Sequence, residues 1–120
     1  MAIAKVREAH QPDTPIAHRS AVTAVDSSDP ADASGAIDTK ETASCHLDIE
    51  ISGVSFTSLT VRVLFWNSRL TKWFGGASRK FTSVGKHALH VDTRGRKIWL
   101  KVTAFTGTSF QLDADYVLIK

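Results

Sequence analysis

The strongest constraint on the fold is an alternation of apolar and polar residues that begins near residue 42. In the stretch SCHLDIEIS, the odd positions from Cys45 to Ile51 are apolar and the positions between them are polar. A period of two gives a β-strand one dry face and one wet face. Three later stretches alternate in the same way: 59–66, 98–105 and 110–115. No segment keeps a helical period over more than two turns, so the chain is predicted to be all-β.

Turn signals divide these stretches into short strands. The stretches 53–58 and 106–109 are read as turns, and Gly75-Gly76 is read as the tip of a hairpin between strands at 71–74 and 78–83. About eight short strands at roughly 8–12-residue spacing are typical of an antiparallel β-sandwich. Their order favours a jelly roll.

The first part of the chain is predicted to differ from the rest. Residues 1–19 lack a sustained period and contain Pro12 and Pro15, which favour extended backbone, so we expect an extended N-terminal arm followed by a sandwich domain over residues 20–120. Within that domain we expect a first strand at 20–26, a long polar turn at 26–36 and a short strand at 36–40.

Composition excludes several classes of protein. The chain is 42% hydrophobic and 22% charged, which argues against a disordered chain. Its apolar run Val63–Trp66 is far shorter than the roughly 20 residues of a membrane-spanning helix, and the first residues lack the apolar core of a secretory signal. Cys45 is the single cysteine, so we expect no internal disulfide.

Charge is distributed unevenly along the sequence. Residues 1–60 contain four basic and nine acidic side chains, a net charge of −5, whereas residues 61–120 contain eleven basic and three acidic, a net charge of +8. Such polarity can steer association with a charged partner. The alternative is that the two halves neutralise each other across one sheet.

The residues that could support catalysis or metal binding are poorly placed for it. Neighbours on a strand point to opposite faces, so Cys45 is predicted to be a buried apolar side chain away from His46. The same geometry separates His87 from His90. For Asp113 and Asp115, ion pairs with Lys101 or Arg62 are expected rather than a Ca²⁺ site. We therefore expect no catalytic, cofactor or metal site.

A basic cluster and two adjacent aromatic residues are the remaining candidates for function. For Arg94, Arg96 and Lys97 we weigh a solvated turn, an acidic protein partner and, last, nucleic acid. Trp73 and Phe74 lie beside the expected Gly-Gly hairpin, where two large exposed rings would be costly, so they are expected either to pack in the core or to contact a partner. Of Trp66, Trp73 and Trp99, at least one is expected in the core.

The register of turns resembles that of small β-sandwich proteins from tailed-phage virions. The matching pieces are Gly53-Val54-Ser55, Trp73, the stretch Arg96–Thr103 and Gly107-Thr108-Ser109, and the resemblance covers roughly residues 20–120. The hairpin NSRLTKWFGG lacks the Asp-Gly pair common in that group, and the arm lies outside the match. The resemblance implies a structural protein of the virion, assembled in the host cytoplasm. Many such proteins decorate capsids as trimers, and others belong to necks, tails or fibres.

With no catalytic motif in the sequence, the resemblance implies a non-enzymatic capsid decoration (cement) protein. It would bind the major capsid protein through its body and arm, form a homotrimer and require no cofactor, membrane or nucleic acid. The alternatives are an adaptor of the neck, tail or fibre, and a carbohydrate-binding β-sandwich module that stacks sugars on Trp66 or Trp73. The residues expected at a protein interface are Ile3, Val6, Arg7, Ile16, Trp73, Phe74, Arg94, Arg96 and Lys97.

Overall fold

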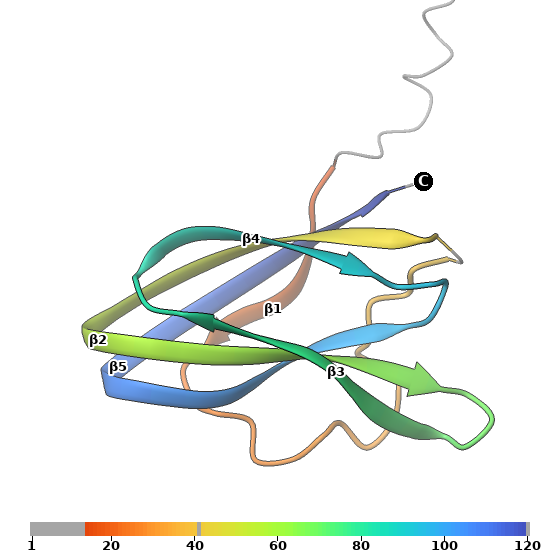
Figure 1. Ribbon diagram of the computed structural model, residues 1–120, viewed down its shortest axis with the longest axis horizontal. Helices are drawn as coiled ribbons and strands as arrows, with labels where there is room; N and C mark the ends of the chain where they lie inside the picture. The colour runs from red at the N-terminus through yellow and green to blue at the C-terminus, as the bar shows by residue number, and fades with distance from the viewer. Residues whose placement is uncertain (1–13, 41, 120) are drawn as a thin grey trace, which may run out of the picture.

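The structure, a computed structural model, describes residues 14–40 and 42–119 and contains strands but no helix in that part of the chain. The five strands form one open antiparallel sheet (Figure 1), which confirms the all-β prediction. No helix that could span a membrane is found among the described residues. The strands are β1 (Ile16–Val22), β2 (Ser44–Asn67), β3 (Lys72–Phe81), β4 (Gly85–Asp92) and β5 (Ile98–Ile119).

Two long strands form the middle of the sheet. β2 and β5 pair over nearly their whole lengths, from Ser44 opposite Ile119 to Phe65 opposite Ile98. β1 pairs with the second half of β5. On the other side of β2, β4 pairs with its first half and β3 with its second half.

The stretches predicted as turns at 53–58 and 106–109 are bends inside β2 and β5. Ser55 has φ +50° and Gly107 has φ +143°, and the register between the two strands shifts between Phe56 and Ser58. Backbone hydrogen bonds resume on both sides of the bend, where Figure 1 shows both strands curving. The predicted number of strands is therefore wrong, because two expected breaks only bend continuous strands.

Three smaller expectations also differ from the structure. The prediction of a hairpin tip at Gly75-Gly76 is wrong, since β3 runs through both glycines with a register shift against β2. The expected strand at 36–40 is reduced to one bridge between Ile37 and Ile98. The first strand begins at Ile16 rather than at residue 20, so residues 16–19 of the expected arm lie in β1.

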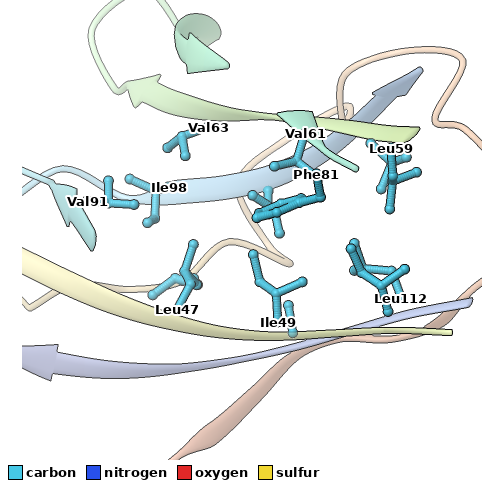
Figure 2. Close-up of a cluster of buried hydrophobic side chains, with 14 of the residues drawn as sticks. Leu47, Ile49, Leu59, Val61, Val63, Phe81, Val91, Ile98 and Leu112 are labelled. Atoms are coloured by element: carbon cyan, nitrogen blue, oxygen red, sulfur yellow. The ribbon is translucent and has the colours of Figure 1, made fainter. Parts of the chain in front are cut away.

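The hydrophobic core lies between the two halves of the bent sheet. Leu59, Val61 and Phe81 in one half face Leu47 and Ile49 in the other (Figure 2), and all five side chains are buried. Leu47, Ile49, Leu59 and Val61 are inward positions of the predicted alternation, whereas Phe81 lies outside the alternating stretches. Burying a side chain of this size contributes about 1.5–3 kcal/mol, so the bend stabilises the fold by bringing two dry faces together.

Side chains from residues 18–26 bond the open edge of β5. His18 Nε2 accepts a hydrogen bond from the Leu100 N–H at 3.1 Å, and Arg19 Nη1 donates to the Leu100 carbonyl at 2.7 Å. Asp26 bonds both backbone groups of Val102, through Oδ2 at 2.8 Å and through its own N–H at 2.9 Å. This edge is therefore satisfied without a regular neighbouring strand.

Candidate functional site

Two turns meet at one end of the molecule. The Trp66 N–H at the end of β2 donates to the Lys97 carbonyl at 2.9 Å, and Arg96 donates back to the Trp66 carbonyl through Nε and Nη2, each at 3.2 Å. Segments thirty residues apart in the sequence are thereby joined. We call this region the basic end, and its defining side chains are Trp66, Arg69, Lys72, Trp73, Arg94, Arg96 and Lys97.

Local hydrogen bonds fix the turn between β2 and β3. Asn67 Oδ1 accepts from the N–H groups of Arg69 and Leu70, at 3.1 and 3.0 Å. An asparagine that bonds the backbone ahead of it holds a tight turn, and Thr71 completes the reversal at φ +52°. The turn therefore presents Arg69 at a defined place beside β5.

Buried hydroxyl groups hold the second turn, between β4 and β5. Thr93 Oγ1 donates to the Thr42 carbonyl at 2.7 Å, and the Gly95 N–H donates to the same carbonyl at 2.9 Å. Arg94 and Gly95 have φ of +51° and +77°, a left-handed pair that reverses the chain sharply. This anchoring sets the backbone from which Arg96 and Lys97 project.

A groove of about 520 Å³ lies between the two turns. Its volume falls within the range of small binding pockets. Asp92 is the acidic residue paired at this end, 3.4 Å from Arg94, and both side chains are largely exposed, so this pair is weak. The groove is lined by Trp66, Asn67, Ser68, Arg69, Gly95, Arg96 and Lys97.

Two tryptophans form the aromatic part of the basic end. The rings of Trp66 and Trp73 meet edge-on, with centroids 5.1 Å apart and planes at 63°. Trp73 Nε1 is buried without a hydrogen-bond partner among the described residues. A second hollow, of about 270 Å³, separates this pair from the segment Asp29–Ala31. Trp66 therefore lines both hollows, whereas Trp73 lines only the second.

The prediction that at least one tryptophan lies in the core is wrong. All three are half-buried. Trp99 is covered by the Arg19 guanidinium, 4.1 Å from its ring centroid, and meets His18 edge-on at 6.3 Å. A cation above the ring shields it from water in place of core residues.

The structure brings five of the nine predicted interface residues toward one end. Four of them lie at the basic end: Trp73, Arg94, Arg96 and Lys97. Phe74 is the next residue of β3 and pairs with Phe65 of β2, whose ring centroid lies 5.7 Å from Cζ of Arg96. Phe74 is 44% exposed, which leaves its ring available for contact.

The other four predicted residues are not placed there. Ile16 lies on β1 opposite Tyr116, at a different edge of the sheet, and is 51% exposed. Ile3, Val6 and Arg7 lie outside the described residues.

Sequence reasoning missed the contribution of the β2–β3 turn. Arg69 lines the groove beside Arg96, although neither composition nor alternation links the two. The sequence did contain a signal for this turn. Asn67 is typical of a tight turn, and the turn residues that follow it place Arg69 between Trp66 and Trp73 in the sequence.

The predicted separation of Cys45 from His46 is confirmed. Cys45 is fully buried, and burial raises the pKa of its thiol to about 11. His46 points to the other face, where its Nε2 lies 3.4 Å from Asp48. A thiol in this environment is a poor nucleophile.

The two histidines of β4 are also on opposite faces, as predicted. His87 packs on Phe81 with ring centroids 4.6 Å apart and its Nε2 lies 2.9 Å from the Ser83 carbonyl, whereas His90 is exposed. Within residues 14–40 and 42–119, no three His, Cys, Asp or Glu residues are arranged to hold a metal.

The predicted ion pairs of Asp113 and Asp115 are wrong. Lys101 pairs instead with Asp29 at 2.8 Å, and Arg62 Nε donates to the Gly76 carbonyl at 3.0 Å. Asp113 accepts a hydrogen bond from the Ala21 N–H at 2.8 Å. β1 and the loop after it thus provide partners that the strand pattern could not show.

The acidic and basic halves of the sequence are partly mixed in space. Asp29–Lys101 is the only ion pair in the described part of the chain that joins an acidic residue of the first half to a basic residue of the second. Lys86 of the second half also lies opposite Glu50 of the first half, so the two halves partly neutralise each other across the sheet. Lys86 lines one hollow together with the acidic residues Asp48, Glu50, Asp113 and Asp115, on the half of the sheet away from the basic end.

The sequence matches no protein-family model and no curated protein, and the fold matches no solved structure.

Proposed function

We propose that this chain is a non-enzymatic structural protein of a virion, a capsid decoration protein that binds and stabilises the lattice of the major capsid protein. The observation that supports docking most strongly is that Trp73, Arg94, Arg96 and Lys97 lie at one end of the sheet, with Phe74 beside them on the other face of β3. Aromatic residues and arginine are enriched at the energetic centres of protein interfaces. The virion setting comes from the resemblance of the sequence.

In this proposal the basic end docks first and the rest of the molecule reinforces the attachment. The bent sheet provides a body whose core and paired edges need no disulfide. The N-terminal arm, with Ile3, Val6 and Arg7, reaches a neighbouring subunit, and Ile16 adds an exposed contact from the start of β1. Contacts linked through one chain raise each other's effective concentration, so several weak contacts give one durable attachment.

The finer architecture and assembly are part of the same proposal. The two halves of the sheet, which face each other across the core, act as the layers of a small jelly-roll β-sandwich (Figure 2). Three copies assemble around a three-fold axis, which gives a closed assembly. Light scattering of the purified protein should give three times the mass of the chain, and a monomer that persists at all concentrations would contradict the trimer.

Electron cryomicroscopy of the particles that contain this chain tests the function. A decoration protein should be present in copies that follow the capsid lattice, with its basic end against the major capsid protein. Copies restricted to one vertex would instead identify an adaptor of the neck, tail or fibre. Absence from the particle would contradict a virion role.

One observation favours a second candidate, a carbohydrate-binding module. The hollow between Asp29–Ala31 and the Trp66–Trp73 pair offers aromatic surface beside a carboxylate, a combination that suits a sugar ring. Glycan-array binding that is lost in Trp73→Ala would support this alternative, and an unreactive array would remove it.

A further inference from the structure

We propose that the groove between the two turns of the basic end binds carboxylate groups from an acidic segment of the partner protein. This inference rests on the proposed function, because it assumes that the basic end docks on a protein. It adds the chemistry of the partner and the residue that recognises it. The recognising residue is Arg96.

The polar side chains of the groove are almost entirely donors. Arg69, Arg96 and Lys97 are cations, and no carboxylate is among the lining residues. The acceptor oxygen of Asn67 is already occupied by two backbone N–H groups, which leaves its amide NH₂ for a ligand. A group that satisfies this set must accept hydrogen bonds and carry negative charge.

Arg96 is oriented before any ligand arrives. Its Nε and Nη2 atoms both donate to the Trp66 carbonyl at 3.2 Å, and its guanidinium lies 5.7 Å from the centroid of the Phe65 ring. These contacts orient the guanidinium and leave both Nη1 hydrogens and the second Nη2 hydrogen without a partner among the described residues, a second fork of donors. A planar fork held in place matches a carboxylate and loses little freedom on binding.

The aromatic geometry favours a protein segment over single-stranded nucleic acid. Nucleic-acid grooves offer successive open rings on which bases stack. Here the Trp66 and Trp73 rings meet edge-on and both are half-buried, so they do not form two parallel platforms. The cations can still neutralise a few carboxylates that are spaced along a peptide.

Binding of a labelled oligoglutamate peptide to the purified full-length protein, measured by fluorescence anisotropy, tests this inference. We expect Arg96→Glu to weaken binding by about tenfold or more, since a charge-assisted contact is lost and a repulsive one is gained. Arg96→Lys keeps the positive charge but loses the planar pair of donors, so its affinity for the peptide should lie between those of the unaltered protein and Arg96→Glu. Lys80→Glu, an equal charge change on an exposed residue of β3 outside the groove, should change binding by less than about twofold.

Three results would overturn the inference. One is an equal loss in Arg96→Glu and Lys80→Glu, which would mean that only net charge attracts the peptide. Another is no binding of oligoglutamate by the unaltered protein. The third is tighter binding of an oligothymidylate of equal charge, which would identify nucleic acid as the ligand.

A second variant protects the test against misfolding. Lys97→Glu alters an exposed side chain and leaves intact the Lys97 carbonyl that bonds the Trp66 N–H, so it should fold and also weaken peptide binding. The assay uses the isolated protein alone. If peptide binding depends on Arg96 but the protein is absent from the particle, only the virion role is contradicted. If the protein is present on the capsid but peptide binding does not depend on Arg96, only the groove proposal is contradicted.

Discussion

The imidazole of His18 is largely buried where β1 meets β5. Its Nε2 accepts from the Leu100 N–H, so the ring must be neutral at that nitrogen. Burial, with a smaller contribution from the neighbouring Arg19 charge, lowers the pKa of His18 from 6.5 to about 4. Protonation therefore competes directly with a bond that holds the edge of β5.

We expect the stability of the protein to fall between about pH 6.5 and pH 4. The unfolded chain binds a proton at His18 near pH 6.5, whereas the folded chain resists it until about pH 4, so acid favours unfolding across this window. The full contribution is present above pH 6.5 and amounts to about 3 kcal/mol. Urea denaturation at a series of pH values measures it.

His18→Gln is the matched control, because an amide oxygen can accept the Leu100 N–H without titrating. Its unfolding free energy should change less over the same pH window than that of the unaltered protein. Identical pH profiles for the two proteins would show that His18 is not the group responsible.

At the scale of the element, the bend in β2 and β5 determines the architecture. Gly107 has φ +143°, a conformation that side chains rarely adopt, and a Cβ atom there would lie 2.6 Å from the Ser55 carbonyl oxygen. The two strands approach closely at this point because Gly107 has no side chain. The bend in turn brings the two dry faces of the sheet together.

We expect Gly107→Val to destabilise the protein by about 2 kcal/mol or more, from backbone strain and the contact with Ser55. Thermal unfolding followed by circular dichroism measures the loss. Thr108→Val at the next, exposed position should change stability by less than about 0.5 kcal/mol. Equal midpoints for the two variants would mean that the bend tolerates a side chain.

The same bend marks how far the sequence could predict the fold. The alternation from Cys45 to Ile51 predicted which side chains are buried, because one face of that strand is dry. It could not predict that β2 continues past Gly53, since turn residues signal a change of direction whether or not hydrogen bonding stops. Strand continuity is set by pairing with β5, which is distant in the sequence.

The candidate site was predictable only in pieces. The basic cluster at residues 94–97 and the ring of Trp73 could be singled out from the sequence. Their meeting could not, because it depends on the bonds between Arg96 and the Trp66 carbonyl. Such a contact follows from sheet register, and register is fixed by pairing along the whole of β2 and β5.

At the scale of the whole molecule, β2 and β5 make the two halves of the sheet one unit. Each long strand passes through both halves, and the core lies between them. Trp66, Trp73 and Trp99 all lie in one half, whereas Cys45 is buried in the other. The molecule thus contains natural probes for each half.

We expect the two halves to unfold together. Tryptophan fluorescence and the reactivity of the Cys45 thiol, followed in increasing urea, should give the same midpoint because neither half can lose its strands alone. Far-ultraviolet circular dichroism, which reports on both halves, is the control and should coincide. A thiol that becomes reactive at lower urea than the fluorescence change would show that the halves separate.

The bonds from His18, Arg19 and Asp26 to β5 also bear on how the protein behaves when concentrated. An unoccupied strand edge is a template on which another chain can extend a sheet, and natural proteins block such edges. Here the block includes a neutral imidazole. Acid storage would therefore remove part of the block and favour aggregation, whereas a neutral buffer would keep the protein dispersed.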